Sequence, residues 1–124
     1  MHKSRLAGFC IDCKTDDLER AAHFWSAALG VPVNTAVESP IYRQLETGPS
    51  DVHIEVQQVP HESRVHLDIE TDDIEAEARR LEALGAKRLQ HIKTWLVMEA
   101  PTGQRFCLVR PQRQDFGQAA NEWR

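Results

Sequence analysis

The sequence has no long apolar run and no run of five charges of one sign. The apolar segment near the N-terminus, residues 6–11, is far shorter than a membrane span or the core of a signal peptide. The formal charge of −4, from 15 basic and 19 acidic residues, is too small to attract nucleic acid or a membrane surface. We therefore expect a cytoplasmic protein with neither of these partners.

Cysteine and glycine are also scarce. The three cysteines, Cys10, Cys13 and Cys107, argue against a disulfide framework, and in a reducing compartment we expect them to be thiols or ligands. Gly30, Gly48, Gly85 and Gly103 fall at expected helix ends and turns, and there is no glycine-rich phosphate loop. No arrangement of serine or cysteine with histidine predicts a nucleophile, and the catalytic residues stay unassigned.

An internal repeat is the strongest feature of the sequence. Residues 15–19 read TDDLE and residues 71–75 read TDDIE, 56 positions later, and Ala-Leu-Gly at 28–30 recurs at 83–85. A chain of 124 residues suits one compact domain, or two small modules that share a core to bury enough apolar surface. We therefore expect two copies of one module, neither of which folds alone.

Each copy contains one expected helix, over 16–29 and 72–84, with an apolar stripe. The helix boundaries are predicted from an acidic N-cap residue, a glutamate three residues later and a C-terminal glycine. These residues are Asp16, Glu19 and Gly30 in the first copy, and Asp72, Glu75 and Gly85 in the second. Phe24 and Trp25 of the first helix are interpreted as packing residues.

One strand is expected before each helix and three after it. The predicted strands are 6–13, 33–38, 41–47 and 52–59 in the first copy, and 64–70, 87–92, 94–99 and 104–110 in the second. Turn residues at 48–51 and 100–103 separate the last two strands of each copy. The sequence thus predicts a single domain, 1–124, of module one (about 5–60), module two (about 64–110) and a polar tail (111–124).

The fold class that follows is α+β, with two tandem βαβββ modules that form a curved mixed sheet around a cup-shaped pocket, helices outside. Alternation along the strands indicates which side chains face the helices and which face the cup. The helix-facing set is Phe9, Ile11, Cys13, Val52, Ile54, Val56, Val65, Leu67, Ile69, Phe106 and Leu108. The cup-facing set is Gly8, Cys10, Asp12, His53, Glu55, Gln57, His66, Asp68, Glu70, Arg105 and Cys107.

The duplicated module resembles the vicinal oxygen chelate superfamily, which includes glyoxalase I, bleomycin resistance proteins and extradiol dioxygenases, and it is most similar to the glyoxalase-like domain group. The resemblance rests on residues 17–30 and 65–73, on Leu-Gly-Ala at 84–86 and on 101–109, and it spans residues 5–110. It implies a homodimer that binds a small organic molecule. A shared fold does not define the reaction, because this superfamily carries isomerases, lyases, dioxygenases and drug-binding proteins.

Metal-binding relatives place ligands on the first and last strand of each module, and the resemblance puts these positions at Cys10, Glu55, His66 and Cys107. A shift of two residues would replace Glu55 by Gln57. Cysteines at two positions disfavour the usual magnesium, manganese or iron site and favour zinc if a divalent metal ion binds at all. The alternative is that Cys10 and Cys107 are small packing residues and that no cofactor is present.

Other candidates also have two interpretations. His66 is a ligand-binding or hydrogen-bonded pocket residue, Asp68 is a general base or, slightly favoured, a structural acceptor, and Trp95 is a pocket wall or a packing residue. Glu70 and Asp12, near strand ends, are expected to be solvated. His2, His23, His53, His61 and His91 are expected at the surface.

Three functions compete. The first is a metal-free protein that binds a small molecule through His66, Asp68, Glu55, Gln57 and Trp95. The second is a divalent-metal-dependent lyase, isomerase or dioxygenase that acts on a substrate with two adjacent oxygens. The third is a structural domain with an unused pocket. We rank them in this order.

Overall fold

A computed structural model describes residues 1–124, and the chain divides into two compact units. One unit is Phe9–Val65, and the other combines Met1–Gly8 with His66–Arg124. The first strand, β1 (His2–Lys14), contributes to both units. The class is α+β as predicted, but the second module also includes the N-terminal residues of the chain.

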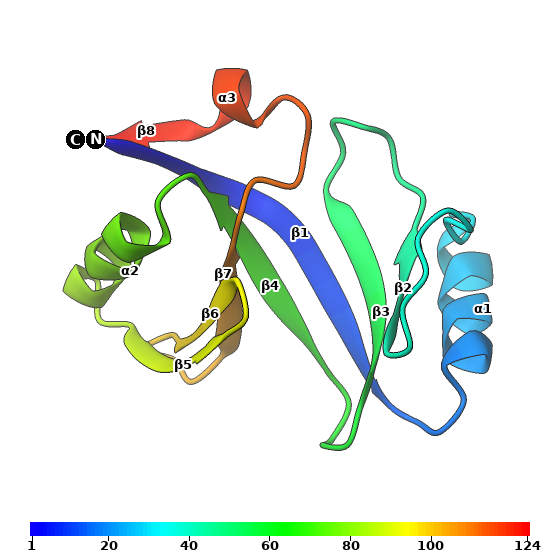
Figure 1. The fold of residues 1–124 in the computed structure, drawn as a ribbon. Helices are drawn as coiled ribbons and strands as arrows, with labels where there is room; N and C mark the ends of the chain where they lie inside the picture. Colours follow the sequence, from blue (N-terminus) through cyan, green and yellow to red (C-terminus); the bar gives the residue numbers. More distant parts are fainter. The chain divides into compact units, whose positions relative to one another are not determined.

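The unit Phe9–Val65 contains helix α1 (Leu18–Leu29) and strands β2 (Tyr42–Leu45) and β3 (His53–Val59). Its strands follow the order β2-β3-β1, and β2 pairs antiparallel with β3 through the predicted turn. Helix α1 lies along β2 and β3 (Figure 1). The helix therefore covers one face of this sheet, and the other face carries the polar residues of the strands.

The predicted strand over 33–38 is wrong. Only Val33 forms an isolated antiparallel bridge, with Leu45. After it the Asn34 side chain accepts a hydrogen bond from the Ala36 amide, and the Asn34 carbonyl accepts one from the Val37 amide. Asparagine readily forms such local turns, which compete with strand pairing. The segment is therefore a shaped loop.

The other unit contains helix α2 (Ile74–Ala83) and strands β4 (Arg64–Thr71), β5 (Lys87–Ile92), β6 (Trp95–Glu99) and β7 (Arg105–Val109). The strand order is β1-β4-β7-β6-β5, with β4 and β7 parallel and the pairs β7–β6 and β6–β5 antiparallel. The sheet is thus mixed, as predicted. Helix α2 contacts β5 and β7 on one face.

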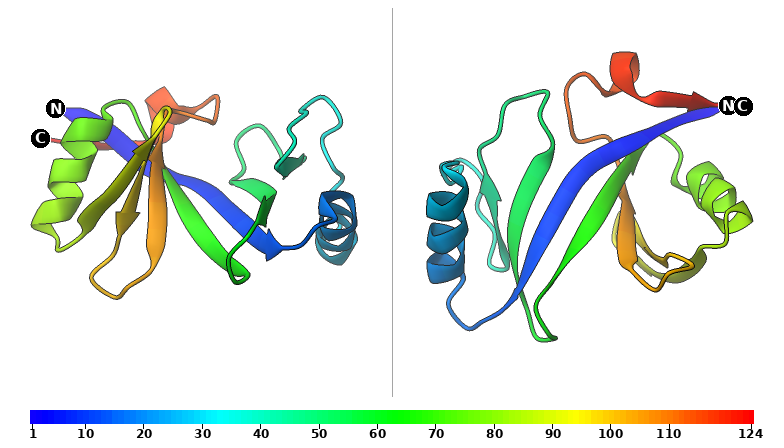
Figure 2. Two further views of the ribbon diagram at one scale, coloured as in Figure 1. Left: turned by 60° about the horizontal axis from the view of Figure 1, so that its bottom comes forward. Right: turned by 180° about the vertical axis from the view of Figure 1, so that it is seen from behind.

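The C-terminal segment is more structured than a tail. It forms the short helix α3 (Phe116–Ala119) and strand β8 (Asn121–Trp123), which pairs antiparallel with the start of β1. All views place β8 along β1, so that the two termini lie close together (Figure 2). The apolar side chain of Phe116 is buried. The unit therefore includes its C-terminal residues.

Both helices begin one residue later than the capping-box prediction. The N-caps are Asp17 and Asp73, whose carboxylates accept hydrogen bonds from the amides of Arg20 and Ala76. Asp72 instead accepts a hydrogen bond from the Lys3 amide. The predicted C-terminal glycines are correct, because both Gly30 and Gly85 have positive φ. An acidic pair at each helix start leaves the choice of cap to tertiary contacts.

Each unit has its own cluster of buried apolar residues. Ile11, Ile54 and Val56 pack under α1, and Phe106 and Leu108 pack under α2, as the alternation predicts. The cup that would be common to both modules stays a prediction.

Some expected core positions are exposed. Val65 and Leu67 are 61% and 50% exposed, whereas Ile69, further along β4, packs against the cluster under α2. Phe24 is 59% exposed and contacts the edge of Trp25, which itself packs against the core. A correct facing on a strand therefore does not ensure burial, since the covering helix has to reach the position.

Several polar residues expected at the surface are buried. Glu70 is fully buried, Asp12 is 3% exposed and His2 is 9% exposed. His2 Nε2 lies 2.8 Å from Oε1 of Glu77, a second fully buried carboxylate, on α2. Buried charges require partners, and these partners come from distant parts of the chain.

Candidate functional site

In the unit Phe9–Val65, the polar face of the sheet is centred on Cys10 and Glu55. The Cys10 thiol donates a hydrogen bond to the Glu55 carboxylate, with 3.6 Å between sulfur and oxygen. Glu55 is opposite Gln44 and Gln57 is opposite Tyr42 in the ladder between β2 and β3, so these side chains share one face. The sequence analysis missed Tyr42 and Gln44, which alternation along β2 would have identified.

Cys10 and Cys13 have the spacing C-x-x-C, which often indicates a metal or redox pair. Here both cysteines lie on one strand, at positions of opposite facing. Cys13 packs against the core under α1, and burial raises the pKa of its thiol. The spacing therefore does not bring the two thiols to one site.

In the other unit, His66 and Asp68 lie two residues apart on β4 and face the same way. His66 Nε2 is 3.5 Å from Asp68 Oδ1, and their side chains are 15% and 20% exposed. Asp68 is directly beside Cys107 in the parallel ladder between β4 and β7. This face thus combines an imidazole, a carboxylate and a thiol that are half-buried, as predicted.

Trp95 also belongs to this face. Its neighbours Leu96 and Met98 point into the core under α2, so Trp95 and Val97 point to the opposite side. Val97 is opposite Cys107 in the antiparallel ladder. The partly buried indole therefore extends the polar face at the far end of β6.

Glu70 follows Asp68 on the same face but is covered by the C-terminal segment. One carboxylate oxygen accepts hydrogen bonds from the amides of Gln112 and Arg113, at 2.6 and 3.0 Å, and the other from the guanidinium groups of Arg5 and Arg113. Burial alone would raise the pKa of Glu70, but these hydrogen bonds lower it below its usual value. Glu70 is therefore a structural anion, fixed in its charged form.

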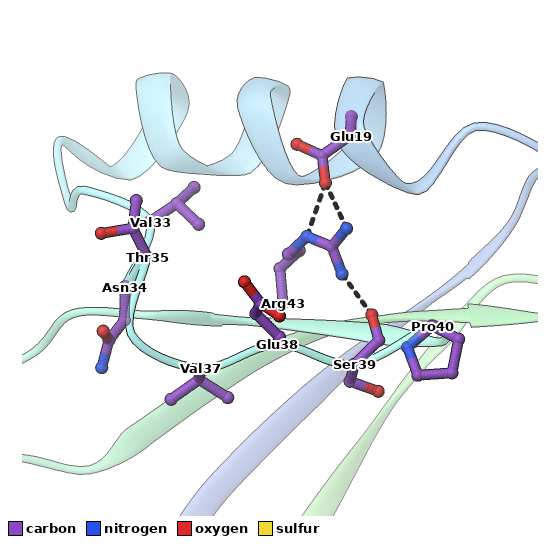
Figure 3. Close-up of a pocket in the computed structure, with 9 residues that line it drawn as sticks. All are labelled: Glu19, Val33, Asn34, Thr35, Val37, Glu38, Ser39, Pro40 and Arg43. Atoms are coloured by element: carbon purple, nitrogen blue, oxygen red, sulfur yellow. Dashed lines mark hydrogen bonds and ion pairs between the residues drawn. The ribbon is translucent and has the colours of Figure 1, made fainter.

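A separate pocket of about 540 Å³ lies on the helix side of the sheet in the unit Phe9–Val65, between α1, β2 and the loop 33–40 (Figure 3). Arg43 is in its centre, with its guanidinium bound by the Glu19 carboxylate and by the Ser39 carbonyl. None of the predicted site residues lines this pocket. The sequence analysis missed it because it depends on the loop that replaces the expected strand.

The residues implied as metal ligands are divided between the two units, with Cys10 and Glu55 in one and His66 and Cys107 in the other. Two thiols fit poorly with manganese or magnesium, which prefer oxygen ligands, whereas thiol, imidazole and carboxylate groups all bind zinc. No helix is long and apolar enough to cross a membrane.

The family model described as "Glyoxalase-like domain" matches residues 8–109 of the chain. This range includes every predicted site residue and ends before α3. No curated protein matches the sequence.

Solved structures share the fold at low sequence identity. A hypothetical protein (BH1468) from Bacillus halodurans C-125 has a TM-score of 0.66 at 12% identity, with 90% of this chain and 96% of that chain covered. A Mn(II)-bound glyoxalase from Novosphingobium aromaticivorans has a TM-score of 0.63 at 14% identity, covering 95% of this chain and 44% of that one. A glyoxalase/bleomycin resistance protein/dioxygenase superfamily member from Vibrio splendidus 12B01 has a TM-score of 0.53 at 21% identity, covering 85% and 98%.

Proposed function

Because the chain belongs to the glyoxalase-like domain family, we propose that it binds a small organic molecule without a catalytic metal ion. The molecule contacts the polar face of β4 and β6, through His66, Asp68 and Trp95. This assignment stays within the range of the vicinal oxygen chelate superfamily, whose members share a fold and differ in chemistry.

The pair His66–Asp68 is the observation that supports this proposal. The two groups are 3.5 Å apart and partly buried, on the sheet face opposite α2. An imidazole beside a carboxylate can both donate and accept hydrogen bonds. Such convergent polar groups beside an aromatic side chain are typical of ligand sites, and they need no metal ion to bind a hydroxyl or carbonyl group.

A titration of metal-depleted, ¹⁵N-labelled protein tests the proposal. Catechol, which has two adjacent hydroxyl groups, is the probe, and resorcinol, with the same groups further apart, is its matched control. We expect saturable amide shifts around 66–68 and 95–97 with catechol in the presence of a chelator. The variant Asp68→Asn should weaken binding, whereas His91→Ala, in an exposed histidine of β5, should leave it unchanged.

The second candidate is a metal-dependent lyase, isomerase or dioxygenase. It is favoured by the carboxylate of Asp68 beside His66, because a metal-binding histidine is commonly oriented by such a group. A bound zinc ion would act as a Lewis acid on adjacent substrate oxygens. Binding of catechol only after Zn²⁺ addition, with one ion per chain that is lost in His66→Ala, would replace the first proposal by this one.

We further propose that the protein is a homodimer in the cytoplasm. The support for dimerisation is the edge strand β5, which pairs only with β6 and whose residues 87–91 are all exposed. Unpaired strand edges are common sites of association. The location rests on the sequence composition alone.

A further inference from the structure

We propose that the pocket beside α1 is a second ligand site, which binds a small organic cation with an apolar body, such as benzylammonium. This site lies on the opposite face of the sheet from Cys10 and Glu55, so it is independent of the function proposed above. The inference rests on the pocket's walls, on its charge and on the way in which its loop is held.

The walls provide apolar contact on one side. Val33, Val37 and Pro40 line the loop side of the pocket, and its volume of about 540 Å³ is in the range of small-molecule sites. Asn34, Thr35 and Ser39 add amide and hydroxyl groups along the same loop. A ring-sized apolar group therefore has a surface to cover.

The basic side chain in the pocket is already engaged. Arg43 Nε donates to Glu19 Oε1 at 2.5 Å, and its Nη1 donates to the carbonyls of Ser39 and Tyr42 at 2.5 and 2.9 Å. An incoming anion would have to displace Glu19 to reach this guanidinium. The pocket is thus not arranged to attract a carboxylate or phosphate.

Glu38 gives the pocket a net negative charge. It is the second acidic residue of the lining, it is exposed, and its carboxylate has no ion pair in this structure. Figure 3 shows its side chain extending from the loop toward α1. An ammonium group at Glu38, with its apolar body over Val37, would satisfy the charge and the apolar wall together.

The loop is fixed in this shape before any ligand binds. The Asn34 amide donates to the Gln44 carbonyl at 2.8 Å, and the Glu46 amide donates to the Pro32 carbonyl at 2.7 Å. Together with the Arg43–Ser39 contact, these bonds attach both ends of the loop to β2 and its flanks. A preformed pocket loses less conformational entropy on binding than a mobile loop would.

The test is a ¹⁵N NMR titration of the full chain with benzylammonium chloride, with benzyl alcohol and benzoate as neutral and anionic controls. We expect saturable shifts confined to the amides around Glu19 and of 33–43, with benzylammonium binding more tightly than either control. The substitution Glu38→Gln should weaken benzylammonium binding about fivefold, as expected for one exposed ion pair. The matched control Glu46→Gln changes a neighbouring exposed carboxylate outside the lining and should have no effect.

Several results would overturn this assignment. They are benzoate binding as tightly as benzylammonium, equal affinities in the variants Glu38→Gln and Glu46→Gln, and shifts that map away from both Glu19 and 33–43. Binding of benzyl alcohol at the same affinity would likewise show that charge plays no part. Both substituted positions are exposed, so we expect folded variants, and far-UV circular dichroism verifies this.

Discussion

Replacing the buried Glu70 by glutamine should destabilise the protein far more than the same substitution at an exposed ion pair. The substitution Glu70→Gln retains the size and shape of the side chain. It removes the negative charge and places an NH₂ group beside guanidinium donors. Arg5 and Arg113 then lose the partner that lies 2.8 and 3.1 Å from their Nε atoms. The substitution thus removes charge from a site with no access to water.

The expected loss follows from the contacts. Breaking a buried ion pair by removing one partner costs about 3 to 5 kcal/mol. Arg5 keeps its contact with Asp115 at 2.6 Å, and Arg113 keeps its hydrogen bond to the Leu6 carbonyl at 2.6 Å. Because both cations retain an acceptor, we expect the lower limit, about 3 kcal/mol. At urea slopes typical of domains this size, the midpoint falls by on the order of 1 to 2 M.

The assay is urea unfolding at pH 7, followed by circular dichroism and by tryptophan fluorescence. The matched control is Glu75→Gln, because Glu75 also binds an arginine, Arg88, through two contacts of 2.7 and 2.9 Å, but is 57% exposed. Exposed pairs contribute little, so the control should remain close to the wild type. Similar losses in the two variants would refute the view that Glu70 fastens the C-terminal segment to the sheet.

The pH dependence gives a second check on the same residue. The pKa of Glu70 is lowered from its usual 4.5 because hydrogen bonds to the carboxylate outweigh its burial. A group with a lowered folded-state pKa stabilises the protein above its unfolded pKa and loses that contribution as the pH falls through the folded value. The difference in stability between wild type and Glu70→Gln should therefore be full at pH 7 and shrink below about pH 4. A difference that grows in acid would contradict this reasoning.

Three further predictions concern the helix caps, a turn and association. Asp17→Ala should cost about 1 kcal/mol in thermal unfolding because it removes the N-cap of α1, whereas Asp16→Ala should cost nearly nothing. Gly85→Ala should be destabilising, since Gly85 has a φ of +105° and an added Cβ would lie 3.3 Å from a proline ring, while Gly117→Ala has open space and should be neutral. Size-exclusion chromatography with light scattering should give twice the mass of the chain, and a monomer at micromolar concentration would rule out the proposed dimer.

The facing of the candidate residues could be predicted from the sequence because side chains on a strand alternate strictly. His66 and Asp68 share a face, as predicted, and the structure adds that Glu55 accepts from Cys10 and that Cys107 lies beside Asp68. The repeat supported the same assignment, since it fixed equivalent positions in the two copies. The local sequence pattern is sufficient to predict these facings, because the facing of a side chain depends only on its position in one strand and on the two-residue alternation.

The buried charges could not be predicted in this way. Glu70 depends on Arg5, 65 residues away, and on Arg113, 43 residues away, and no local spacing relates them. A polar C-terminal sequence is typical of a solvated tail, but here its charges are paired inside the unit. The strand predicted over 33–38 is wrong for a related reason, because the hydrogen bonds of Asn34 within the turn replace those of a strand.

The two copies have diverged at the positions that carry their chemistry. Cys10 and Asp12 are the repeat equivalents of His66 and Asp68, 56 residues later in each case. In the first copy both residues are buried, and Cys10 donates to Glu55 on a neighbouring strand. In the second copy both stay partly exposed and pair with each other along one strand. The Cys10 thiol is thus occupied by a contact within the protein, whereas a partly exposed imidazole beside a carboxylate can donate or accept a hydrogen bond from a ligand. The ligand contacts proposed for His66 and Asp68 therefore have no equivalent at Cys10 and Asp12 of the first copy.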